Sequence, residues 1–192
     1  MEETPHFKIV MLGESGVGKT ALLERVSDGS FSEGHIPTIG AQYTLYQMDV
    51  GGKQINLELW DTAGQEVYIS LVSFYARDTH GAILTFDLAD KNTFEALGKW
   101  VKFARDSSPD IKIIVFGNKL DLIEDSVPYQ SEIDDFVERN SLVYIEGSAK
   151  TGQNVAEAFT RMGEFMLDMI PEMPTDTSVR PTVEKTEGRK CC

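Results

Sequence analysis

Residues 13–20 have the sequence Gly-Glu-Ser-Gly-Val-Gly-Lys-Thr, which fits the phosphate-binding pattern G-x-x-x-x-G-K-[ST]. The apolar run before it, residues 7–12, predicts a short strand, and the spacing of residues 21–26 predicts a helix after it. A glycine-rich turn between a strand and a helix directs backbone N–H groups, and the positive end of the helix, at an anion. The stretch therefore predicts an α/β fold with a site for a nucleoside triphosphate.

Each fixed position of this loop has a physical role. The glycines allow a tight turn and a close approach of the backbone, because they have no Cβ. Lys19 can reach the β- and γ-phosphates, and the hydroxyl of Thr20 can ligate Mg²⁺. The residues expected to bind the nucleotide here are Ser15, Gly16, Val17, Gly18, Lys19, Thr20 and Ala21.

A second polar segment indicates which base is bound. Residues 111–122 form a buried-strand pattern that runs into Asn118-Lys119-Leu120-Asp121, where a strand's carboxyl end would face a ligand. One carboxylate can accept both adjacent donors of guanine, whereas adenine would leave it unpaired, so Asp121 favours guanine. Alone, this segment could equally be a polar turn after a strand.

A third segment, Ser148-Ala149-Lys150, follows the next predicted strand and strengthens the guanine hypothesis. The backbone N–H of Ala149 would meet guanine O6, and the stem of Lys119 would cover the face of the base. We therefore expect a bound GTP or GDP with Mg²⁺.

Five separated segments together resemble a small GTPase of the Ras superfamily, most of all its Rab branch. They are GESGVGKT, the PTIG around Thr38, WDTAGQE at 60–66, NKLD at 118–121 and GSAK at 147–150. The resemblance covers residues 6–170 and the last two residues. It implies a P-loop GTPase fold: a six-stranded, mostly parallel sheet with one antiparallel strand and helices on both faces. It also implies slow GTP hydrolysis without an activating protein.

The resemblance assigns further site residues. Thr38 would join Mg²⁺ and the γ-phosphate, Asp61 would hold the metal through water, and the Gly64 N–H would meet the γ-phosphate. Gln65 would orient the attacking water, so that catalysis is positioning and electrostatics. Phe31 stands where the family has an aromatic residue over the guanine edge, although a lone phenylalanine is also common in a core.

Partner binding is implied by an aromatic triad, Tyr43, Trp60 and Tyr75, through which Rab proteins meet effectors. Three such residues near a sheet edge could also be partly buried core. The family pattern further implies an exchange factor, a GTPase-activating protein (GAP) and a GDP-dissociation inhibitor, all acting on the switch regions of a monomer. His35 is interpreted as a solvated loop residue rather than a catalytic base.

Two positions depart from the Rab pattern. Val67 replaces an arginine that normally braces the second switch, and Gln42-Tyr43 replaces an acidic or small residue followed by phenylalanine. Val67 supports the alternative function, a membrane-tethered binding module that holds GTP and hydrolyses little. Gln65 favours the enzyme, and the segment from Asn118 to Asp121 argues against an adenine-nucleotide kinase.

Composition is typical of one globular domain with a sizeable core. The chain has 192 residues, of which 41% are hydrophobic and 26% charged. No apolar stretch reaches the length of a membrane span, and no signal-peptide pattern is visible at the N-terminus. We expect residues 1–170 to form the GTPase domain and 171–192, poor in large apolar residues, to form a disordered tail.

Strand and helix patterns alternate along the domain as in βαβ units. Gly51-Gly52 predicts a hairpin turn. Predicted strands beyond the first are 42–50, 54–60, 82–88, 111–117 and 142–146. Residues 27–40 form a predicted loop, residues 62–77 a loop with a short helix, and the remaining predicted helices are 91–105, 130–140 and 155–170.

The last two residues, Cys191 and Cys192, suggest a membrane anchor. In Rab-like chains such a pair accepts two geranylgeranyl groups, and two lipid chains are what stable attachment needs. The net charge is −13, while acids and bases balance in residues 171–192, so no basic patch assists binding to anionic lipid. The acidic charge also argues against nucleic acid as a partner. We expect the protein on the cytoplasmic face of intracellular membranes, such as vesicle or endosomal membranes, with a cytosolic pool.

Overall fold

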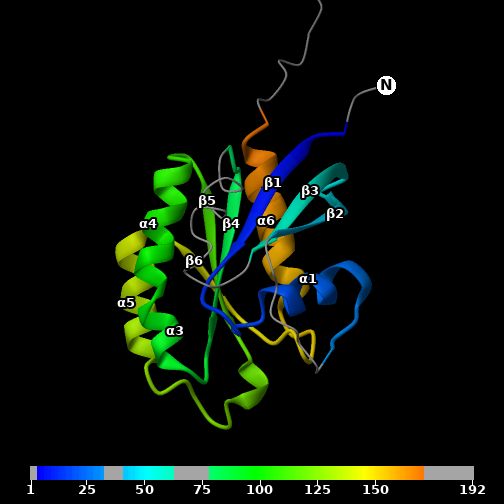
Figure 1. Ribbon diagram of the computed structural model, residues 1–192. Helices are drawn as coiled ribbons and strands as arrows, with labels where there is room; N and C mark the ends of the chain where they lie inside the picture. Colours follow the sequence, from blue (N-terminus) through cyan, green and yellow to red (C-terminus); the bar gives the residue numbers. More distant parts are fainter. Residues whose placement is uncertain (1–3, 33–40, 63–77, 171–192) are drawn as a thin grey trace, which may run out of the picture.

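A six-stranded sheet lies at the centre of the molecule, with helices packed on both of its faces (Figure 1). This computed structural model describes residues 4–32, 41–62 and 78–170. The strands are β1 (His6–Leu12), β2 (Ala41–Val50), β3 (Lys53–Thr62), β4 (Gly81–Asp87), β5 (Lys112–Asn118) and β6 (Val143–Glu146). The helices are α1 (Lys19–Asp28), α3 (Lys91–Glu95), α4 (Leu97–Ser107), the 3-10 turn η2 (Leu120–Leu122), α5 (Gln130–Asn140) and α6 (Val155–Asp168).

The strand order is β2-β3-β1-β4-β5-β6, and β2 alone runs antiparallel to its neighbour among the described strands. Gly51 and Gly52 join β2 to β3 with φ of 60° and 83°, the left-handed conformations that a type I′ hairpin turn requires. The predicted sheet and its hairpin are thus confirmed. All parallel strands end at one edge, which places the segments after β1, β4, β5 and β6 together.

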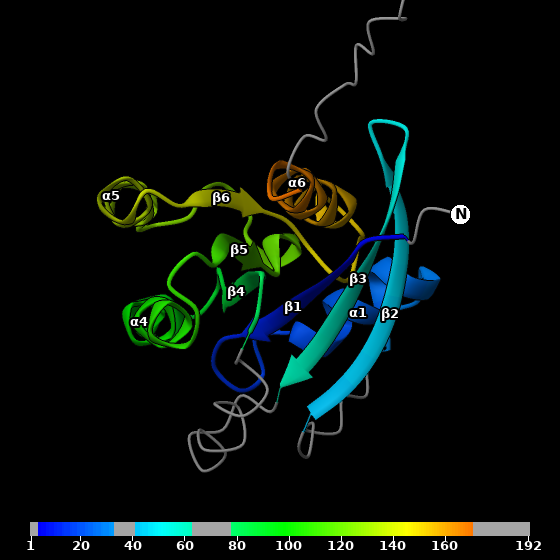
Figure 2. The same cartoon turned by 90° about the horizontal axis from the view of Figure 1, so that it is seen from above.

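Helices cover both faces of the sheet (Figure 2). The sheet separates two apolar clusters, one under the helices of each face. On one face α1 and α6 cover alternate residues of β1, such as Ile9 and Met11. On the other face α3, α4 and α5 cover Val10 and Leu12. Because both faces are covered, β4 is buried along its whole length, as expected of a central parallel strand.

Most predicted elements are confirmed, with ends that differ by one or two residues, and α5 has the predicted bounds. One prediction is wrong: residues 91–105 do not form a single helix. The chain breaks at Ala96, which has φ of −74° and ψ of −13°, so α3 ends and α4 begins. Phe94 and Leu97, on either side of the break, both lie in the same apolar cluster.

The short helix expected within 62–77 and the tail 171–192 lie outside the described residues. None of the described helices is long and apolar enough to span a bilayer.

Candidate nucleotide-binding site

The phosphate-binding loop connects β1 to α1 at the carboxyl edge of the sheet. Gly13 has φ of 139°, and a Cβ there would lie 2.1 Å from the carbonyl oxygen of Thr85 on β4. Gly18 has φ of 97°, and its Cβ would lie 2.3 Å from Nδ2 of Asn118. Both glycines are therefore required by close packing, and the loop is pressed against the strands that frame the site.

Lys19, the first residue of α1, lies beneath this loop and is almost completely buried. Its Nζ donates to the carbonyl oxygens of Gly13, at 2.9 Å, and Glu14, at 2.8 Å. Burial lowers the pKa of the Lys19 ammonium to about 8, while the nearby carboxylates of Asp61 and Glu14 oppose this shift. Anionic oxygens next to Nζ would favour the charged form, so this arrangement suits a phosphate chain.

A hydroxyl and a carboxylate meet beside Lys19. Thr20 Oγ1 donates to Asp61 Oδ2 at 2.6 Å, and Asp61, near the end of β3, is 1% exposed. Among the described residues there is no cluster of three or more His, Cys, Asp or Glu that could hold a metal alone. Mg²⁺ commonly takes one or two protein oxygens and completes its shell with phosphate and water, so Thr20 and Asp61 fit this ion.

Asn118, the last residue of β5, connects the phosphate side of the site to the base side. Its Nδ2 donates to Val17 O at 2.8 Å, and its Oδ1 accepts from the Ala149 N–H at 2.9 Å. The side chain is 2% exposed, and both its nitrogen and its oxygen are hydrogen-bonded. Residues 17, 118 and 149, far apart in sequence, are thus brought together. The N–H of Ala149, expected to meet guanine O6, is also the donor to Asn118.

The remaining base-side residues follow β5. Ser148 Oγ donates to Asp121 Oδ1 at 2.5 Å, which orients the carboxylate expected to bind guanine. Lys119 has a left-handed backbone, with φ of 65°, and its Nζ forms an ion pair with Asp87 Oδ2 at 2.6 Å. Lys150 is exposed. The three sequence segments therefore meet at one edge of the sheet.

Asp87, the last residue of β4, is a site residue that the sequence analysis missed. Besides holding Lys119, its Oδ1 accepts from the Ala89 N–H at 2.9 Å, and its backbone N–H donates to Thr93 Oγ1 at 2.9 Å. The rule that singled out Asn118, a polar residue at the carboxyl end of a buried parallel strand, also applies to Asp87.

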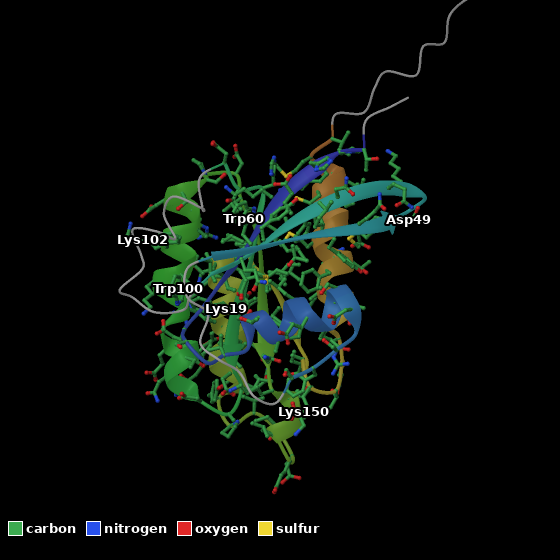
Figure 3. The ribbon with its side chains drawn as sticks, turned by 45° about the vertical axis from the view of Figure 1, so that its right-hand side comes forward. Lys19, Asp49, Trp60, Trp100, Lys102 and Lys150 are labelled. Atoms are coloured by element: carbon green, nitrogen blue, oxygen red, sulfur yellow. The ribbon has the colours of Figure 1, made fainter. Side chains whose placement is uncertain are left out.

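Glu14 was also missed, because its position in the loop pattern accepts any residue. Its Oε1 accepts from the Trp100 indole N–H at 2.9 Å and pairs with Lys99 Nζ at 2.7 Å. Lys19 of α1 and Trp100 of α4 thus approach Glu14 from different helices (Figure 3). The phosphate-binding loop is therefore attached to both.

The predicted aromatic residues have different surroundings. Phe31 is partly buried against the core on the α1 side, with the Arg25 guanidinium 6.0 Å from its ring centre. Tyr43 is 48% exposed and lies against Trp60, with ring centres 5.4 Å apart, so Tyr43 is not a core residue. Other predicted positions lie outside the described residues: His35, Thr38, Gly64, Gln65, Val67, Tyr75, Cys191 and Cys192.

The fold and the convergence of these segments define a P-loop nucleotide-binding protein. A model of the Ras family matches residues 8–168. Ras-related protein RABD2a of Arabidopsis thaliana is 35% identical over 185 residues, which cover 95% of this chain and 91% of the relative. GTP-binding protein YPTM2 of Zea mays is 33% identical over 193 residues, covering 97% and 95%. Ras-related protein Rab-1D of Dictyostelium discoideum is 38% identical over 190 residues, covering 96% and 93%.

The chain belongs to the Ras family. It is a Rab-type small GTPase, a GTP-regulated switch of vesicle trafficking.

Proposed function

We propose that this chain binds GTP and GDP with Mg²⁺ at the edge where β1, β4, β5 and β6 end. The observation that supports it most is the bridge made by Asn118 between Val17 of the phosphate-binding loop and Ala149 of the base loop. A single buried carboxamide thereby fixes the distance between the phosphate side and the base side of one ligand. Ser15, Gly16, Gly18 and Ala21 complete the proposed phosphate contacts.

Different residues of the site would bind the phosphates, the Mg²⁺ ion and the base. Lys19 supplies a buried positive charge for the phosphates, and the N-terminus of α1 adds its dipole. Thr20, Asp61 and Thr38 would hold Mg²⁺, which when bound neutralises charge that develops on the phosphate oxygens. Asp121 would accept the two guanine donors, Lys119 would cover the face of the base, and Phe31 would close over its edge. Lys150 and Ser148 support the base loop.

Hydrolysis would depend on residues that position the attacking water and the γ-phosphate. Gln65 would orient a water molecule toward the γ-phosphate, and the Gly64 N–H would contact that phosphate. In this family such a switch turns over slowly by itself, because no arginine is supplied in cis. The alternative, a module that holds GTP and hydrolyses little, is supported by Val67 alone. A single-turnover measurement with and without a GAP separates the two.

The proposed partners use the outer face of β2 and β3. Tyr43 is exposed there and lies against the half-buried Trp60, and Tyr75 would join them in effector binding. The exchange factor, the GAP and the GDP-dissociation inhibitor would act on the switch segments. Geranylgeranyl groups on Cys191 and Cys192 would hold the protein on the cytoplasmic face of an intracellular membrane.

Calorimetric titration of the nucleotide-free full-length chain with GDP, GTP and ATP, each with Mg²⁺, tests the proposal. We expect tight binding of both guanine nucleotides and at least about 10⁴-fold weaker binding of ATP, because adenine cannot satisfy Asp121. Equal affinity for ATP and GTP would reject the assignment of the base site.

A further inference from the structure

The loop between β6 and α6 runs beside α1 (Figure 1). The side chain of Arg25, in the last turn of α1, joins the two. Its Nε donates to the carbonyl oxygen of Ala149 at 2.8 Å, and its Nη2 donates to that of Lys150 at 2.6 Å. Nη1 donates to the carbonyl oxygen of Gly29 at 2.5 Å. One guanidinium therefore satisfies three carbonyl groups from two segments that are more than a hundred residues apart.

The aliphatic stem and the guanidinium face of Arg25 also lie against other residues. A Cβ built on Gly152 would lie 3.6 Å from Cδ of Arg25, so the turn after Lys150 lies along the arginine stem. The ring of Phe31 lies on another side, with its centre 6.0 Å from the guanidinium carbon. Arg25 thus fills the space between the base loop and the segment that leaves α1.

The loop that Arg25 holds orients two base-side residues. Ser148 donates to Asp121, and the Ala149 N–H donates to Asn118. The carbonyl oxygen of the same residue, Ala149, accepts the hydrogen bond from Arg25. A shift of this loop would therefore disturb the orientation of both Asp121 and Asn118.

We propose that Arg25 is a positioning residue for guanine recognition: by fixing residues 149 and 150 against α1, it sets the rate at which the guanine nucleotide dissociates. This inference rests on the proposed function of the site. An arginine suits the role because its planar fork offers five donors in fixed directions, whereas a lysine has one ammonium on a flexible stem.

The test compares Arg25→Ala and Arg25→Lys with the parent as full-length chains loaded with fluorescent GDP and Mg²⁺. Dissociation is followed after addition of excess unlabelled GDP. We expect release about tenfold faster for Arg25→Ala, which corresponds to about 1.4 kcal/mol, and an intermediate rate for Arg25→Lys. Single-turnover hydrolysis of bound GTP should keep the parental rate, because the hydrogen bonds described for the Arg25 guanidinium go to Gly29, Ala149 and Lys150 rather than to the phosphate-binding residues.

Arg105→Ala is the matched control. Arg105 also lies in the last turn of a helix and donates from Nη2 to a carbonyl of another element, Asn140 O, at 2.7 Å, but on the α4–α5 side. Its loss should leave GDP release unchanged. A double-mutant cycle with Ser148→Ala should show that the two changes are not additive, since both act through the same loop.

Failure of the proposed function and failure of the inference about Arg25 give different results. If the parent binds no guanine nucleotide, the proposed function fails before Arg25 is tested. If the parent binds but Arg25→Ala releases GDP at the parental rate, or if Arg105→Ala accelerates release equally, the inference about Arg25 is wrong. Should Arg25→Ala not fold, Arg25→Lys decides, and an unchanged release rate for that variant overturns the proposal.

Discussion

Replacing Asp87 with asparagine should accelerate the release of GDP. Asp87 Oδ2 lies 2.6 Å from Lys119 Nζ, and we propose that the stem of Lys119 covers the face of the guanine. Asparagine has nearly the same shape and can still accept from the Ala89 N–H, which Asp87 Oδ1 accepts at 2.9 Å. The substitution therefore removes mainly the negative charge that holds the lysine.

The magnitude follows from how far the pair is buried. The side chain of Asp87 is 12% exposed and that of Lys119 is 33% exposed. Exposed ion pairs contribute about 0–1 kcal/mol, and losing one partner of a fully buried pair costs about 3–5 kcal/mol. This pair lies between these limits, and the Nδ2 group of asparagine cannot accept from the lysine in place of Oδ2, so we expect about 1.5 kcal/mol. That corresponds to about a tenfold faster release.

The assay is the dissociation of fluorescent GDP from the full-length chain in the presence of Mg²⁺. Glu132→Gln is the matched control, because Glu132 pairs with Lys91 at the same distance, 2.6 Å, but with side chains 52% and 42% exposed. This control should release GDP at the parental rate. Lys119→Ala serves as the positive reference.

A parental rate for Asp87→Asn, together with faster release from Lys119→Ala, would refute the reasoning. It would mean that Lys119 holds its position over the base without the aspartate. Equal acceleration by Glu132→Gln would also count against it, since a general charge effect would then explain the result.

The remaining predictions concern the base, the chemistry, the anchor and pH. Asp121→Asn should weaken GTP and favour xanthine nucleotides, which titration of both would reveal; unchanged selectivity would remove Asp121 from the site. Gln65→Leu should slow single-turnover GTP hydrolysis without weakening binding, and a parental rate would show that Gln65 positions no water. Deleting Cys191 and Cys192 should move the protein to the cytosolic fraction with nucleotide binding intact; continued sedimentation with membranes would indicate a protein tether. Burial raises the pKa of Tyr129 to about 12 from 10.0, so its contribution to stability should be complete below pH 10 and be lost as the pH rises toward 12; absorbance titration of the parent and Tyr129→Phe checks this.

The fold could be predicted largely from local patterns. The strand before the phosphate-binding loop, the helix after it and the Gly51-Gly52 turn each have a short-range signal, and the structure confirms all three. The break at Ala96 had no such signal. Alanine is the strongest helix former, so its intrinsic propensity predicts a continuous helix there.

The site was predictable where a motif fixes the residue type. Lys19, Thr20 and Asn118 are named by their motifs, and the structure brings them to one edge. Arg25 and Asp87 could not be found in this way. Arg25 acts through the backbone carbonyl groups of Ala149 and Lys150. Because any residue can supply a backbone carbonyl, the residue types at these positions do not indicate the contact.

The hydrogen bond from Trp100 to Glu14 has a practical consequence for spectroscopy. The chain contains two tryptophans, Trp60 and Trp100. Trp100 contacts the phosphate-binding loop through its indole N–H, and Trp60 immediately precedes Asp61, which accepts from Thr20. The emission of each indole should therefore report nucleotide binding at a different part of the site. A variant with a single tryptophan would give the signal of that part alone. Loading and unloading could then be timed with natural nucleotides, free of any attached dye.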